Sequence, residues 1–298
     1  MAGLACATRL ADAGRDVLCL DKGRGPGGRM ATRRVEVGGE TLRFDHGAQY
    51  FTVRDEDFSH QVSRWQEQRV CARWPIAGDD AWVGTPSMSA PIRALAEQVP
   101  VEWDERATGV EPVADGWRVS TESTTYEART AVLAIPPEQA GPLLAYHQPS
   151  LAARARDTES QPCWAAMASF AERLPLPDIV RDKGPVSWAA RDSAKPGRAG
   201  GECWIIHATH EWSSAHLDRA KEDVAQKLLA GLSDDIEAPD PTYLTAHRWL
   251  YALPRPLAGA PAMWDADRRI GVAGDWLIAP RVESGWVSGQ RLAELILE

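Results

Sequence analysis

The first 34 residues constrain the fold more than any other part of the chain. Apolar residues recur at helical spacing between positions 4 and 11, and Gly14 ends the pattern. Residues 16–20 then form a short apolar run, typical of a buried parallel strand, and Asp21 follows it. A helix, a strand and an acid at the strand end are the second part of a βαβ unit that binds a dinucleotide. In such a unit the acid contacts ribose hydroxyls.

The glycine fingerprint of this unit is only half present. Because the acid follows the fingerprint by about 20 residues, Gly3 falls at the third glycine of G-x-G-x-x-G and Met1 at its fourth position. The first strand and the first two glycines would then lie upstream of Met1. We therefore expect that the start at Met1 is misassigned and that the natural chain begins upstream of it. Two alternatives remain open: an ordinary αβ unit that happens to end in an acid, and a truncated, inactive fragment of a dinucleotide-binding domain.

A basic, glycine-rich turn follows the acid. Residues 22–34 read K-G-R-G-P-G-G-R-M-A-T-R-R. Glycines let backbone N–H groups approach an anion closely, and arginine side chains bind phosphate oxygens in pairs. The turn predicts a phosphate site, with a solvated basic loop as the alternative.

Composition limits the possible partners. The 298 residues carry a net charge of −9, which argues against nucleic acid or an anionic membrane as a partner. No apolar run approaches the ~20 residues of a membrane span. The five cysteines are scattered and form no C-x-x-C pair, so we expect reduced thiols, a cytoplasmic protein and no metal site. Of the 13 tryptophans, we expect most to pack in the core, although the group between Trp164 and Trp249 could line an aromatic pocket.

Three motifs stand out along the chain: G-G-R-M at 27–30, F-D-H-G-A-Q-Y-F-T at 44–52, and Gly274-Asp275 followed by R-V-E-S-G-W at 281–286. Together they resemble the renalase family, a branch of the FAD-dependent amine-oxidase-like flavoproteins. The resemblance covers nearly the whole chain. It implies an α/β fold, with a Rossmann-like FAD-binding domain and an inserted α+β substrate domain built on a mixed or antiparallel sheet. The expected FAD domain comprises 1–62, 89–145 and 262–298, and the substrate domain 63–88 and 146–261.

The resemblance also implies how FAD is bound. Val110 would contact the adenine through its main chain, Asp275 would accept a hydrogen bond from a ribityl hydroxyl, and the helix N-terminus near Glu283 would face the flavin ring. The residues expected to bind FAD are Gly3, Asp21, Lys22, Gly27, Gly28, Arg29, Met30, Gly47, Ala48, Gln49, Tyr50, Val110, Gly274, Asp275, Val282, Glu283 and Gly285.

The activity implied by the resemblance is that of an oxidase. Its substrates would be misreduced 2- or 6-dihydro isomers of NAD(P)H, whose hydride passes to the flavin and then, as electrons, to O2 to give H2O2. Lys195 and Arg198 would meet the phosphates of such a dinucleotide. His46 is expected to order its turn rather than to act as a base. The candidate catalytic residues are Trp188, Arg191, His247 and Trp249. An amine oxidase with the same flavin chemistry is the alternative.

The secondary structure of the other segments follows from periodicity. We expect a hairpin at 33–44, a helix at 57–69, and one continuous helix at 212–232 with Ser213 or Ser214 as its cap.

Overall fold

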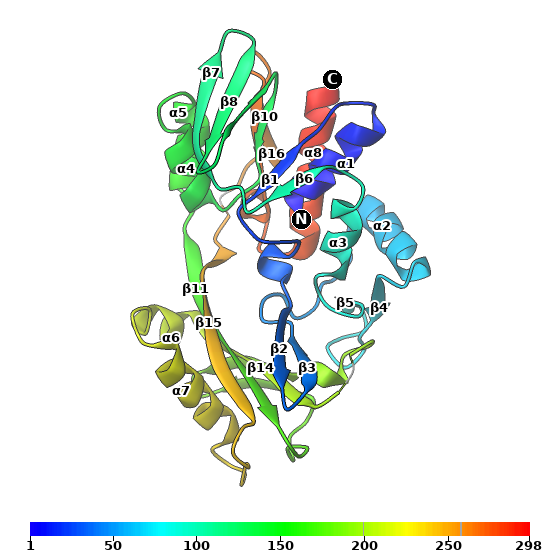
Figure 1. Ribbon diagram of the computed structural model, residues 1–298, viewed down its shortest axis with the longest axis vertical. Coiled ribbons are helices and arrows are strands. Elements are labelled where there is room, and N and C mark those ends of the chain that lie inside the picture. Colours follow the sequence, from blue (N-terminus) through cyan, green and yellow to red (C-terminus); the bar gives the residue numbers. More distant parts are fainter. Residues whose placement is uncertain (199, 257) are drawn as a thin grey trace.

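The computed structural model describes residues 1–198, 200–256 and 258–298. Figure 1 shows an elongated molecule with both termini in its upper half, where α1 and α8 lie side by side, and with the long strands β11 and β15 reaching into the lower half. The helices are α1 (Ala2–Asp12), α2 (Glu56–Glu67), α3 (Ala90–Ala96), α4 (Pro137–Leu144), α5 (Pro149–Arg156), α6 (His210–Ala215), α7 (Lys221–Ser233) and α8 (Val282–Leu297).

Two small groups of parallel strands form the centre of the upper half. β1 (Cys19–Asp21) pairs with β6 (Val101–Trp103), and β10 (Ala131–Leu133) pairs with β17 (Ile270–Ala273). The antiparallel strand β16 (Ala262–Asp265) adds to β17. Among the described strands, none pairs with the second edge of β1 or of β10. The strand expected at 16–20 therefore begins only where β6 offers hydrogen-bond partners.

The two ends of the chain meet where α1 packs on α8. A Cβ at Gly289 would lie 2.2 Å from the carbonyl oxygen of Ala2, so this close approach requires glycine. Cys6 and Leu10 of α1 are buried with Leu292 of α8 in one small core. This contact places residues 1–30 beside the segment that follows β17.

A five-stranded antiparallel sheet dominates the lower half (Figure 1), in the order β12-β13-β14-β11-β15. Helix α7 covers one face, where Val224, Leu228 and Leu232 pack against Trp204 and Ile206. The strands are β11 (Ser160–Phe170), β12 (Ile179–Lys183), β13 (Val186–Arg191), β14 (Glu202–Ala208) and β15 (Tyr243–Pro254).

The remaining strands form small hairpins and one three-stranded sheet, and the expected hairpin at 33–44 is confirmed. These strands are β2 (Arg33–Val37), β3 (Glu40–Phe44), β4 (Cys71–Arg73), β5 (Trp82–Gly84), β7 (Ala107–Val113), β8 (Gly116–Thr121) and β9 (Thr125–Ala128).

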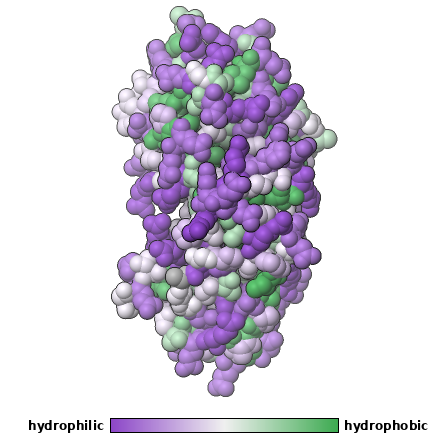
Figure 2. Space-filling model, turned by 90° about the vertical axis from the view of Figure 1, so that its right-hand side faces the viewer, coloured by the Kyte–Doolittle hydropathy of each residue, from purple (hydrophilic) through white to green (hydrophobic). Residues whose placement is uncertain are grey.

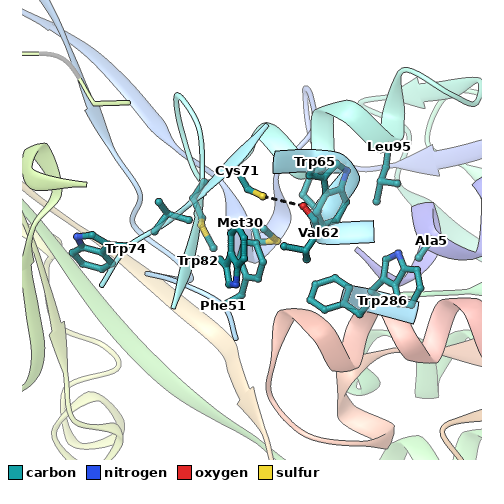
Figure 3. Packing of buried hydrophobic residues seen from close by; sticks show 14 of the residues in the cluster. Ala5, Met30, Phe51, Val62, Trp65, Cys71, Trp74, Trp82, Leu95 and Trp286 are labelled. Atoms are coloured by element: carbon teal, nitrogen blue, oxygen red, sulfur yellow. Dashed lines mark hydrogen bonds between the residues drawn. The ribbon is translucent and has the colours of Figure 1, made fainter. Parts of the chain in front are cut away.

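Most tryptophans are core residues, as expected. Trp65, Trp82 and Trp286 share one cluster with Phe51 (Figure 3), and Phe58 belongs to the same cluster. The cluster joins α2, β5 and α8.

The expected single helix at 212–232 is wrong, because the structure has two helices there, α6 and α7. The cap of α6 is Thr209, whose hydroxyl accepts a hydrogen bond from the N–H of Trp212. The break has a tertiary cause. The indole of Trp164 donates to the carbonyl of His216, and Arg248 donates to the carbonyl of Leu217. A continuous helix would need those two acceptors for itself.

The face shown in Figure 2 is mostly hydrophilic, with only small separate apolar patches. In the described parts of the chain, no helix is both long and apolar enough to cross a membrane. No group of three or more His, Cys, Asp or Glu side chains in those parts is placed to hold a metal ion.

Candidate functional site

One cavity of about 2240 Å³ runs through the molecule and is lined by residues from both ends of the chain. Pockets for small ligands usually measure about 300–1,000 Å³, so this cavity has room for an extended dinucleotide and a second ligand. Its wall includes β1 and β10 in the upper half and parts of β13, β14 and β15 in the lower half. All of the expected FAD-binding residues except Glu283 line it.

At one end of the cavity lies the acid that ends β1. Asp21 accepts a hydrogen bond from the N–H of Gly23, at 2.7 Å, which fixes its carboxylate at the start of the glycine-rich turn. Lys22 donates to the side chain of Gln139 on α4. Gly3 and Val110 also line the cavity. This end therefore offers a carboxylate, a free backbone edge and apolar contacts.

The turn at residues 27–30 joins the two ends of the chain chemically. The guanidinium of Arg29 donates to both carboxylate oxygens of Asp275, at 2.8 and 2.5 Å, and also to the carbonyl of Ala252. Asp275 follows Gly274, whose N–H donates to the hydroxyl of Ser288 on α8. An ion pair thus lies in the cavity wall, between the N-terminal turn and the strand end of β17.

A second turn, residues 47–50, packs directly on the first. The N–H of Ala48 donates to the carbonyl of Arg29 at 2.8 Å. A Cβ at Gly47 would lie 2.0 Å from that same carbonyl oxygen, which no other residue could tolerate. The side-chain amide of Gln49 donates to the carbonyls of Asp45 and Gly47 and closes the turn. In the described chain, the N–H groups of Gly47, Gln49 and Tyr50 have no acceptor and remain available to a ligand.

The start of α8 also faces the cavity. Val282 and Gly285 line it, and the side chain of Met1 lies 3.5 Å from the position a Cβ of Gly285 would take. Glu283 is the exception, because its carboxylate is turned toward the N–H groups of Arg54 and Asp55, at 2.5 and 2.8 Å. It holds the start of α8 against the segment before α2.

Aromatic side chains line the lower part of the cavity. Trp188 on β13 lies 5.5 Å from Tyr50, measured between ring centroids. Trp249 on β15 donates its indole N–H to the carbonyl of His46 at 2.8 Å. We call Tyr50, Trp188 and Trp249 the aromatic frame, and all three line the cavity.

Two of the candidate catalytic residues do not line the cavity. Arg191 is 1% exposed, and its guanidinium is bound by Glu202, Asp178 and two carbonyls. Since side chains alternate along a strand, Trp188 and Arg191 lie on opposite faces of β13, and the expectation for Arg191 is wrong. His247 is likewise not on the wall. Its ring packs edge-on against His46 and Trp249, with centroids 4.9 and 4.4 Å apart.

The expected phosphate contacts of Lys195 and Arg198 are also wrong. Both side chains are buried and form ion pairs with Asp45, and Lys195 forms a second one with Asp192. Burial alone would raise the pKa of Asp45. The charges of Lys195 and Arg198, with hydrogen bonds from Thr32 and Met88, outweigh burial and lower that pKa to about 2.

His207 lines the cavity but was not among the residues expected at the site. It is the one ionisable side chain besides a cysteine in the apolar run 203–208, a signal that could have identified it. Burial lowers the pKa of His207 to about 4. Burial, with the nearby charge of Arg33, also lowers the pKa of His46 and of His247 to about 4. All three histidines are therefore neutral at pH 7.

Comparison with known proteins agrees with this geometry. The sequence profile of the NAD(P)-binding Rossmann-like domain matches residues 1–65, and that of the flavin containing amine oxidoreductases matches residues 75–297. The chain belongs to the flavin containing amine oxidoreductase family.

Solved structures share the fold of this amine oxidoreductase at low sequence identity. Cyclohexylamine oxidase from Brevibacterium oxydans IH-35A superposes with a TM-score of 0.72 at 13% identity, over 99% of this chain and 96% of that one. A triple mutant of putrescine oxidase gives 0.69 at 13% identity, with the same coverage. A putative protoporphyrinogen oxidase from Exiguobacterium sp. 255-15 gives 0.58 at 15% identity. The match covers 73% of this chain and spans about half the length, 52%, of that oxidase.

Membership of this family implies FAD, and the cavity fits that cofactor. The volume suits a dinucleotide, and the turn at 47–50, which lines the cavity, has N–H groups without an acceptor in the described chain. A cation, Arg29, and an acid, Asp21, also line the cavity. The expected α/β fold, with a Rossmann-like part and a substrate-binding part, is confirmed.

Proposed function

We propose that this protein is an FAD-dependent oxidase of the renalase type, acting on 2- or 6-dihydro isomers of NAD(P)H. The observation that carries the proposal is the aromatic frame, which offers flat surfaces to a flat dihydropyridine ring. When bound, FAD would accept a hydride from the substrate and pass the electrons to O2, giving H2O2.

The side chains of the cavity would orient the substrate rather than deprotonate it. The indole of Trp249 is held by its hydrogen bond to His46, and Trp188 is braced by Arg181, whose guanidinium carbon lies 4.1 Å from the centre of its ring. Rings held in this way favour one orientation of a stacked ligand and exclude bulkier molecules. A dihydropyridine needs no base to lose a hydride. The neutral histidines around the frame are compatible with that requirement.

The cofactor would occupy the upper cavity. We propose that Asp21 contacts ribose, Val110 the adenine, Arg29 the diphosphate, and Asp275 the ribityl chain, with the start of α8 near the flavin ring. The FAD domain would comprise 1–62, 89–145 and 262–298, and the substrate domain 63–88 and 146–261. All five cysteines are free thiols, which supports a cytoplasmic location.

An amine oxidase is the second candidate. The profile match over residues 75–297 favours it, since amines are the substrates that give that family its name. An amine cation could also lie against the tryptophan faces of the aromatic frame. The two candidates share the cofactor and differ only in what reduces it.

The test is to load the purified 298-residue chain with FAD and to record absorbance near ~450 nm without oxygen. Bleaching by 2- or 6-dihydro NAD isomers, but not by ordinary 4-dihydro NADH, would support the proposal. Admitting O2 should then restore the band and release H2O2. Bleaching only by cyclohexylamine or putrescine would establish the amine oxidase. Failure to retain FAD would contradict both candidates and favour an inactive chain.

A further inference from the structure

A buried cluster of four charged side chains lies against the turn at residues 47–50. Asp45, Asp192, Lys195 and Arg198 have side chains that are at most 3% exposed. Asp45 precedes the turn, whereas the other three belong to the loop between β13 and β14. Two carboxylates face two cations, so the cluster carries no net charge. None of these four residues lines the cavity.

Lys195 stands at the centre of this cluster. Its ammonium nitrogen lies 2.5 Å from Asp192 Oδ1 and 3.5 Å from Asp45 Oδ2. Arg198 binds the same oxygen of Asp45, Oδ2, at 2.5 Å and donates to the carbonyl of Gly84. The carboxylate of Asp192 also accepts the N–H of Asp45 at 3.2 Å. The loop of the five-stranded sheet is thereby tied to the start of the turn.

Gln49 connects the cluster to the cavity wall. Its Oε1 accepts a hydrogen bond from Lys195 at 3.1 Å, while its Nε2 donates to the carbonyls of Asp45 and Gly47. The cation allows only one orientation of this amide, because a flipped amide would turn Nε2 toward the ammonium group and Oε1 toward the two carbonyls. Gln49 itself lines the cavity. A buried charge outside the cavity thus sets the geometry of a group inside it.

We propose that Lys195 is a positioning residue, which acts through Gln49 to hold the turn at Gly47–Tyr50 in the shape that meets FAD. Its function goes beyond neutralising Asp45 and Asp192. Without Lys195, the amide of Gln49 loses one of the three partners that fix it, and its two hydrogen bonds to the carbonyls hold the turn less firmly. The free N–H groups of the turn then lose part of their support. The part of this inference that concerns FAD rests on the proposed function, whereas the part that concerns the turn does not.

The decisive comparison is between Lys195→Met and the double variant Asp192→Asn/Lys195→Met. The single variant leaves two buried carboxylates facing one cation, so we expect a lower melting temperature. The double variant restores charge balance and should recover most of that loss. Neither variant can donate a hydrogen bond to Oε1 of Gln49. We therefore expect the 44–51 segment to exchange its amide hydrogens about fivefold faster or more in both variants. The dissociation constant for FAD should rise about tenfold in both.

Two further variants make the test selective. Gln49→Met removes the link while every charge of the cluster keeps its partner, and it should reproduce the faster exchange. Lys183→Met is the matched control, because Lys183 also pairs with two aspartates and a carbonyl but lies at the edge strand β12, away from the turn. It should leave both exchange at 44–51 and FAD affinity unchanged.

The proposal is overturned if the double variant recovers native exchange and FAD affinity together with stability, since charge neutralisation would then be the whole role of Lys195. Native exchange in Gln49→Met would overturn it as well. If the unaltered chain retained no FAD, the proposed function would fail, but the exchange measurements would still decide the role of Lys195.

Discussion

Arg29 and Asp275 lie 246 positions apart in the sequence and form a bidentate ion pair in the wall of the cavity. Each belongs to a different end of the chain, and each follows a parallel strand of the upper half. The packing of α1 on α8 brings them together, because that contact sets the N-terminal turn beside the strand end of β17. The pair joins the two ends of the chain in the cavity wall.

Replacing Arg29 with methionine should weaken FAD binding about tenfold or more, because the cavity wall loses a cation and Asp275 loses the guanidinium that fixes its carboxylate. The free energy of unfolding should fall by only about 1 kcal/mol, since the Arg29 side chain is 36% exposed and its ion pair is partly screened by solvent. Titration with FAD and urea denaturation measure the two effects. Arg9→Met is the control, because Arg9 forms a surface pair with Glu294. Equal FAD affinity in Arg29→Met and the native chain would remove Arg29 from the cofactor site.

Replacing Trp188 or Trp249 with alanine should raise KM for a dihydropyridine substrate about tenfold, because a stacking surface is lost. FAD binding should change little, since both side chains lie in the lower cavity. Steady-state kinetics of H2O2 release measure KM. Trp212→Ala is the matched control, because that indole stacks on His216 and does not line the cavity. An unchanged KM in both frame variants would mean that the substrate does not bind at the aromatic frame.

Replacing Gly47 with alanine should destabilise the protein by about 1–3 kcal/mol, because the new Cβ would clash with the carbonyl of Arg29 and push the two turns apart. FAD affinity should fall with it. Gly25→Ala serves as the comparison, since a Cβ there meets no atom within 4 Å. Thermal melting of the two variants distinguishes them. Similar melting temperatures would show that the contact between the turns yields easily.

Acidification from pH 7 to pH 5 should lower the melting temperature, by on the order of 5 °C. In the unfolded chain, histidines bind protons near pH 6.5, whereas the pKa values of His46, His207 and His247 in the fold are lowered to about 4 by burial. The unfolded state therefore binds more protons between these two values, and stability is lost as pH falls through that window. Asp45, with a pKa lowered to about 2, gives up its contribution only below about pH 4.

A variant separates the buried histidines from the rest of the chain. His207→Asn should flatten the dependence of the melting temperature between pH 6.5 and pH 4, while the exposed His60→Asn should leave it as in the native chain. The same slope in all three proteins would show that His207 does not take part.

The cofactor motifs were predictable from sequence because each is local. An acid at a strand end, a glycine-rich turn and a helix start are defined by a few consecutive residues, and all three line the cavity. The aromatic frame was predictable only in part. Trp188 and Trp249 reach the cavity, while Arg191, three residues from Trp188, points to the opposite face of β13. Odd and even positions of a strand point to opposite faces of the sheet, so Trp188 and Arg191 cannot both face the cavity. Which of the two faces it depends on which face of the sheet the rest of the fold covers.

The sequence by itself determined most of the helices and strands, the order of the turns and the chemistry offered by Asp21, Arg29, Gly47 and Asp275. These features depend on short-range backbone geometry and on side-chain type. The break between α6 and α7 and the start of β1 were decided by tertiary contacts. Tertiary structure alone decided which charged side chains line the cavity and which are buried in ion pairs of the core. Lys195 and Arg198 look like phosphate ligands in sequence, yet the fold buries them against Asp45 and Asp192. A buried charge must have a partner, and that partner is chosen by how distant segments pack.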